Sequence, residues 1–214
     1  MAIAFSLSIA IAAIIGWIRF EKINPAYYPF LFFIWIGLLN ETISVTVVDI
    51  FHKKSILNNN IYVLSESLIL TWQFKKWSLF VRLNNIFIIV IISFILLWFS
   101  EGFFISGINS PLHYFRIFYS VGIVLMSVST INSLIVHERK NILKNPIFII
   151  CIGFLIYFTY KVIVWGFWLY GVSLSNEFSR NINRILIYIN LFCNLIYALA
   201  VLWIPTRHRF SLPS

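Results

Sequence analysis

Long runs of apolar residues, separated by short polar segments, set the pattern of this chain. A helix needs about 20 mainly apolar residues to cross the roughly 30 Å of hydrocarbon in a membrane. The pattern therefore predicts seven membrane-spanning helices, over residues 2–18, 27–48, 56–74, 79–99, 112–136, 147–170 and 185–204. The runs are continuously apolar and lack the alternation of membrane β-strands. We expect an all-α integral membrane protein that forms one seven-helix transmembrane domain over residues 1–214.

Basic residues in the connecting segments predict how these spans are oriented. Four lie after even-numbered spans, namely Lys53, Lys54, Arg180 and Arg184. Ten lie after odd-numbered spans or in the tail, namely Arg19, Lys22, Lys75, Lys76, Arg82, Arg139, Lys140, Lys144, Arg207 and Arg209. Cytoplasmic loops carry the excess of lysine and arginine. We therefore expect the N-terminus outside and the C-terminus in the cytoplasm, in a cytoplasmic (inner) membrane of bacterial type.

Composition agrees with a membrane protein and narrows the partners. The chain is 61% hydrophobic and 11% charged, against about 45–50% apolar and about 25% charged in soluble domains. The net charge of +9 lies in the loops, where it is explained by topology and by attraction to anionic lipid. We expect the lipid bilayer as a partner and no nucleic acid. Cys151 and Cys193 lie inside apolar spans, which is typical of small packing residues rather than a disulfide or metal pair.

A weak internal repeat is visible in the segments that follow the first and fifth spans. Each enters the next span through Asn-Pro, at Pro25 and Pro146, and each following span then carries a charged residue, Glu41 or Lys161. A duplication would give three helices, a linking fourth and three more, a 3+1+3 plan that resembles the sugar-transporter and PQ-loop group. Neither the second nor the sixth span contains Pro-Gln, so the resemblance stops at the fold plan. Helix starts favour proline in any case, so coincidence remains the alternative.

The charge at Lys161 is the most unusual feature of the apolar spans. It lies about 15 residues beyond Pro146, which at 1.5 Å per residue places it near the middle of the membrane. A charge there costs at least about 2.5–3.5 kcal/mol, so it must face protein or water and find a partner. Glu41 and Glu66 are the candidate partners at a similar depth. Asp49 and Glu101 lie at span ends, where they can reach water.

Two acids beside one base would leave one carboxylate to bind a proton or a cationic ligand. Further polar side chains are expected at the same level, and the full set of candidate ligand- or ion-binding residues is Glu41, Glu66, Lys161, Asn40, Asn190, Asn194, His113, Arg116 and Tyr157. Each has a structural alternative. Asparagines can join neighbouring helices, a Glu-Lys pair can be an internal strut, and His113 and Arg116 can lie among lipid headgroups.

Enzyme and photoreceptor chemistry have little support. The chain contains no HExxH and no GxSxG, and its four histidines are scattered, so we assign no catalytic residue, metal or cofactor. The last span holds no lysine for a retinal-type Schiff base. The leading hypothesis is a small-molecule or ion transporter. The alternative is a seven-helix sensory or accessory module that binds a ligand and signals through a separate partner, and a homo-oligomer or a structural subunit of a complex is also open.

Overall fold

The computed structural model describes residues 8–49, 52, 55–80, 84–137, 142–169 and 176–206, and within these ranges the chain is helical and contains no strand. The long helices are α2 (Ile9–Arg19), α3 (Tyr28–Asp49), α4 (Ile56–Lys76), α5 (Asn84–Ser100), α6 (His113–His137), α7 (Pro146–Leu169) and α8 (Asn176–Trp203). Short turns of helix are η1 (Phe20–Lys22), η2 (Pro25–Tyr27), the π-helical η3 (Glu101–Ile105) and η4 (Ile142–Lys144). Each predicted span overlaps one long helix.

Five helical segments of the described chain are long and apolar enough to cross a membrane, which supports membrane integration. They are Pro25–Val48, Asn85–Ile105, His113–Val136, Pro146–Leu169 and Arg180–Trp203. The described part of α2 is only 11 residues long. Helix α4 is more polar because it turns Asn60, Glu66 and Gln73 toward the protein interior, where all three are buried. The count of seven spans and their orientation therefore remain predictions.

Several residues on which those predictions depend lie outside the described ranges. They are the start of the first predicted span, residues 2–7, and the basic residues Lys53, Lys54, Arg82, Arg139, Lys140, Arg207 and Arg209.

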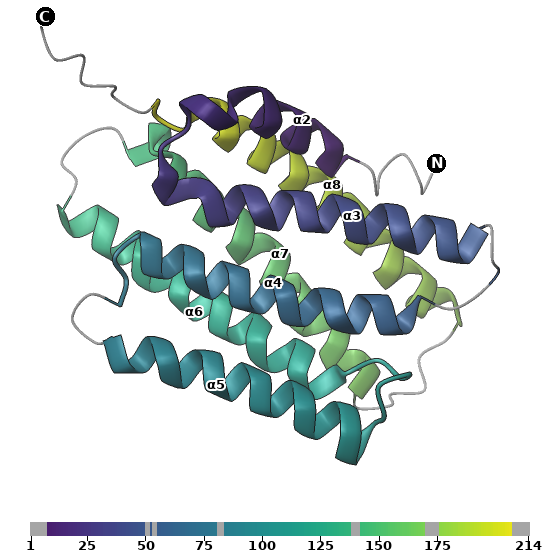
Figure 1. Ribbon diagram of the computed structural model, residues 1–214. Helices are drawn as coiled ribbons and strands as arrows, with labels where there is room; N and C mark the ends of the chain where they lie inside the picture. Colours follow the sequence, from purple (N-terminus) through teal and green to yellow (C-terminus); the bar gives the residue numbers. More distant parts are fainter. Residues whose placement is uncertain are drawn as a thin grey trace, which may run out of the picture.

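Six of the long helices form a closed circle, and α5 lies outside it (Figure 1). Going round, α2 packs against α3, α3 against α4, α4 against α6, α6 against α7, α7 against α8, and α8 returns to α2. Helix α5 packs against α4 and α6, along one edge of the bundle. Residues of α4 and α7 can therefore meet inside the circle although they are far apart in sequence.

Arg19 joins the ends of α2 and α8. Its guanidinium donates to the carbonyl oxygens of Val201 and Leu202, and at 3.0 Å to that of Ile204. The last carbonyls of a helix have no partner within the helix and carry partial negative charge, so a cation there is stabilising. Because both helices end at this point and pack against each other, α2 and α8 run in the same direction.

The two Asn-Pro segments fold alike locally. Asn24 accepts a hydrogen bond from the amide of Ala26, and Asn145 accepts one from the amide of Ile147, each at 2.9 Å. Both asparagines thus cap the helical turn that the proline begins. The glycines deeper in the two helices differ, because Gly37 of α3 faces α2 whereas Gly153 of α7 faces Tyr197 of α8. The two segments are therefore similar at their asparagine caps but not deeper in the helices, and the 3+1+3 repeat remains a prediction.

A layer of aromatic rings fills the circle on the side of the Arg19 contact. Phe30 and Phe33 of α3, Phe154 of α7 and Tyr197 of α8 lie with their ring centroids 5.6–6.2 Å apart in every pair. Edge-to-face aromatic pairs at such distances stabilise a core beyond their buried area. This layer separates the Arg19 end from the polar interior described next.

Candidate functional site

Lys161 of α7 and Glu66 of α4 form an ion pair inside the circle. The lysine Nζ lies 2.9 Å from Glu66 Oε2, and the two residues are 5% and 1% exposed. The Tyr119 hydroxyl, from α6, accepts a hydrogen bond from the same ammonium and donates one to Glu66 Oε2. Three helices therefore contribute to one buried polar contact. The pairing of Lys161 with Glu66, which the sequence left open between two acids, is given by this geometry.

Glu66 is also held by its own helix. Tyr62 lies one turn before it and donates to Glu66 Oε1 at 3.0 Å. Residues four apart lie on the same face of a helix, which places both side chains toward the interior. Glu66 thus accepts from Tyr62, Tyr119 and Lys161. Charge-assisted hydrogen bonds of this kind offset the cost of burying a carboxylate.

Aromatic rings surround the ammonium group of Lys161. Its Nζ lies 5.1 Å from the ring centroids of Tyr119 and Tyr157 and 5.2 Å from that of Phe158. Faces of aromatic rings attract cations, most strongly where water is excluded. The lysine is therefore stabilised by one carboxylate, one hydroxyl and three rings.

A small polar cavity of about 40 Å³ adjoins this ion pair. Its lining comes from α2, α3, α4, α7 and α8, and consists of Ile9, Phe33, Gly37, Glu41, Tyr62, Glu66, Tyr157, Asn190, Asn194 and Tyr197. One water molecule needs about 10–15 Å³ measured in this way, whereas pockets for larger organic ligands have about 300–1,000 Å³. In this conformation the cavity has room for a small ion or a few waters.

Tyr197 lines the cavity and carries a buried hydroxyl. Tyr197 is 2% exposed, and its hydroxyl has no hydrogen-bond partner among the described residues. A buried donor or acceptor without a partner costs about 1–3 kcal/mol. Asn194, on the same helix, instead donates to Ser8 Oγ at 2.8 Å. A polar species bound at the cavity would find in Tyr197 a hydroxyl that no described residue uses.

The structure brings together most, but not all, of the predicted site residues. Glu41, Glu66, Tyr157, Asn190 and Asn194 line the cavity, and Lys161 touches it through Glu66. The other three predicted residues, Asn40, His113 and Arg116, lie elsewhere.

Asn40 belongs to the contact between α3 and α4. It donates to Asn59 Oδ1 at 3.2 Å and accepts from Asn58 Nδ2 at 2.8 Å. This amide cluster holds the ends of two neighbouring helices together, which is the structural role that asparagine commonly has between membrane helices.

His113 and Arg116 form a second cluster toward the start of α6. Arg116 is buried, donates to Asn60 Oδ1 at 3.1 Å, and lies 4.6 Å from the centroid of Trp165. The ring of His113 packs on the same tryptophan, with centroids 5.3 Å apart. Asn60 also donates to the carbonyls of residues 108 and 110 at 2.9 and 2.8 Å. The burial of Arg116 shows that this side chain packs in the protein interior instead of among lipid headgroups.

The expectation that Glu101 reaches water is wrong. Its side chain is fully buried and accepts from the amides of Tyr114 and Phe115, at 3.0 and 2.6 Å. The first amides of a helix lack partners and carry partial positive charge. Glu101 supplies both partners for the start of α6, and the π-helical turn at the end of α5 places it there. A carboxylate at such a position needs no water.

Sequence reasoning missed the two tyrosines that complete the ion pair. Tyr62 could have been found, because it precedes Glu66 by four residues on one helix. Tyr119 carries no comparable signal, since its contact depends on how α6 packs against α7. Comparison of the chain with protein-family models, with curated proteins and with solved structures finds no match.

Proposed function

We propose that this protein is a membrane transporter for a small cation or a proton, and that the cavity beside Glu66 is its binding site. The observation that carries the proposal is a polar cavity between the helices, lined by two glutamates and by Tyr197, whose buried hydroxyl has no partner among the described residues. Charged groups inside a membrane are costly, and they commonly mark ion or substrate pathways.

The chemistry of the lining favours a cation. Two glutamates, Glu41 and Glu66, and three tyrosines, Tyr62, Tyr157 and Tyr197, are among the residues that line the cavity. Oxygen ligands suit hard cations. The volume of about 40 Å³ supports an ion over a metabolite. Among the transported species that the sequence allows, a small ion therefore fits best.

Lys161 gives this site a means of switching. It holds one oxygen of Glu66, while Glu66 also lines the cavity. A cation that enters the cavity would compete with the lysine for the same carboxylate. Binding would then favour a conformation in which Lys161 has moved away, because a ligand shifts an equilibrium by its differential affinity for the two states. The aromatic layer around Phe154 would have to rearrange for the ion to pass.

The distribution of basic residues predicts the orientation of the chain and the membrane in which it lies. The N-terminus faces outward and the C-terminus faces the cytoplasm, in a cytoplasmic membrane of bacterial type. The polar cavity then lies in the outer half of the membrane, and the aromatic layer lies on its cytoplasmic side.

Ion flux into reconstituted vesicles tests the proposal. The purified chain is placed in vesicles, and the flux of protons, Na⁺ and K⁺ is followed with ion-sensitive dyes. We expect the parent to conduct one of them above the level of empty vesicles, and Glu66→Gln and Glu41→Gln to reduce that flux at least tenfold. Glu177→Gln is the matched control, because this glutamate is exposed and lies at the start of α8, more than three helical turns before Asn190, the first α8 residue of the cavity lining.

Two outcomes would contradict transport. Folded Gln variants at both positions that keep full flux would show that the carboxylates have no part in it. Saturable cation binding without any flux of the parent would favour the sensory alternative.

A further inference from the structure

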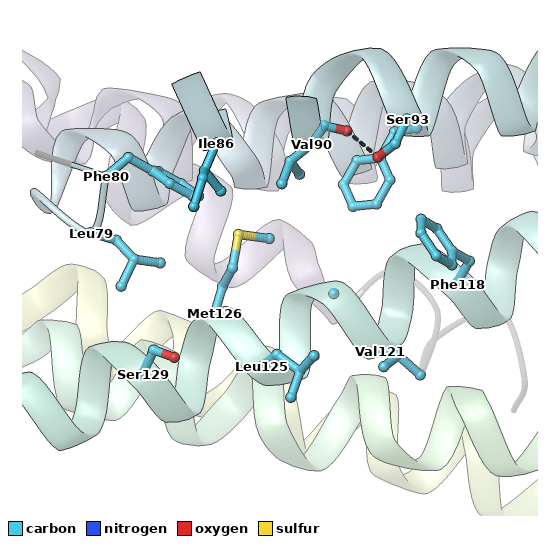
Figure 2. Close-up of a pocket in the computed structure, with 12 residues that line it drawn as sticks. Leu79, Phe80, Ile86, Val90, Ser93, Phe118, Val121, Leu125, Met126 and Ser129 are labelled. Atoms are coloured by element: carbon cyan, nitrogen blue, oxygen red, sulfur yellow. Dashed lines mark hydrogen bonds between the residues drawn. The ribbon is translucent and has the colours of Figure 1, made fainter. Parts of the chain in front are cut away.

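An apolar groove lies between α5 and α6, on the outside of the six-helix circle (Figure 2). Its volume is about 390 Å³, and it is lined by Leu79, Phe80, Ile86, Val90, Ser93, Phe94, Phe118, Val121, Gly122, Leu125, Met126 and Ser129. Figure 2 shows Val90 of α5 and Met126 of α6 pointing into the space between the two helices. Such a groove in the side of a membrane protein faces hydrocarbon.

The groove has the length of a single leaflet. On α5 its lining runs from Ile86 to Phe94, near the start of the helix. At 1.5 Å per residue this part of α5 covers about 12 Å, close to half of the roughly 30 Å hydrocarbon layer. The groove is therefore long enough to hold an acyl chain across one leaflet. That leaflet is the one at the end of the bundle where α4 ends and α5 begins.

That end of the bundle is basic. Lys75 and Lys76 close α4, are both exposed, and line a second cavity of about 560 Å³ together with Trp72 and Phe87. Phe87 packs on Phe80 of the groove, with centroids 5.7 Å apart, so a single aromatic pair adjoins both spaces. Basic side chains at the surface of a membrane attract anionic headgroups.

We propose that α4, α5 and α6 form a binding site for an anionic phospholipid. One acyl chain fills the α5–α6 groove and the phosphate contacts Lys75 and Lys76. A second copy of this chain fits the surface less well, because a copy with the same orientation in the membrane would bring its own lysine pair to the same end. A neutral lipid would fill the groove and leave both lysines without a counter-charge.

Crosslinking with photoreactive lipids tests this site. The full chain is reconstituted with phosphatidylglycerol or phosphatidylcholine that carries the same diazirine-labelled acyl chain, and the labelled peptides are mapped by mass spectrometry. We expect labelling concentrated on the groove residues of α5 and α6, and stronger with phosphatidylglycerol. Lys75→Gln and Lys76→Gln should each lower that preference about fivefold.

A variant that fills the groove distinguishes lipid binding at this site from ordinary contact with bulk lipid. Ser129→Phe places a ring in the groove and should reduce labelling there by both lipids, whereas Val128→Phe adds the same ring at an exposed neighbouring position outside it. Melting temperatures report whether each variant is folded. In the parent, excess unlabelled phosphatidylglycerol should displace the probe better than phosphatidylcholine does.

The proposal is overturned by either of two results. Equal labelling with both lipids would show that the lysines do not select an anionic headgroup. Labelling spread evenly around all the lipid-facing helices would show that the groove is not a specific lipid site. Neither result bears on ion flux through the Glu66 cavity.

Discussion

Removing one member of the Glu66–Lys161 pair should cost more than removing both. Glu66→Leu leaves a buried ammonium with only the Tyr119 hydroxyl and aromatic rings around it. Lys161→Met leaves a carboxylate that still accepts from Tyr62 and Tyr119. Breaking a buried pair costs about 3–5 kcal/mol. We expect Glu66→Leu near the upper end of that range and Lys161→Met near the lower end.

The double variant should recover much of the loss, because two apolar side chains of similar volume replace an ion pair that had itself to be desolvated. Unfolding free energies are measured by denaturant titration of the purified protein in mixed micelles, followed by circular dichroism. A coupling free energy of at least about 2 kcal/mol is expected from this double-mutant cycle. Additive losses in the double variant would refute the pairing and, with it, the site built on it.

Three further changes test the surroundings of the pair. Tyr119→Phe should lower the unfolding free energy by about 1–3 kcal/mol, since it removes a hydroxyl that bridges two charges; an unchanged value would contradict that bridge. Gly153→Ala should destabilise by about 1–3 kcal/mol, because a Cβ there would lie 2.5 Å from the Tyr197 ring, whereas Gly166→Ala meets nothing within 4 Å and should be neutral in the same melting assay. Glu101→Leu should cost about 1–3 kcal/mol by freeing two amides of α6, and a melting temperature equal to that of the parent would argue against this cap.

Much of this architecture could be predicted from the sequence, because an apolar run of about 20 residues is long enough to form a membrane-spanning helix. The depth of Lys161 likewise followed from counting residues along one helix, and it pointed to Glu66 or Glu41 as the partner. Depth alone could not separate Glu66 from Glu41, since that choice depends on which way each helix is rotated in the bundle.

Other parts of the site depend on packing between segments that are distant in sequence. Tyr119 meets Lys161 only because α6 and α7 lie side by side. The position of Glu101 at the end of an apolar run suggested contact with water. Its carboxylate instead accepts hydrogen bonds from two amides at the start of α6, and this contact depends on how α5 and α6 pack. His113 and Arg116 lie within two turns of Tyr119 on α6 but pack on Trp165, apart from the cavity lining.

Cation-dependent melting of the Lys161→Met variant tests whether a small cation competes with Lys161 for Glu66. Parent and variant are titrated with Na⁺, K⁺ and methylammonium at constant ionic strength, with N-methylglucamine as a balancing cation too large for a cavity of about 40 Å³. If the account is correct, Lys161→Met is stabilised by one of the small cations at a lower concentration than the parent, and Glu66→Gln loses the effect. Melting temperatures of Lys161→Met that do not depend on which cation is present would contradict the account.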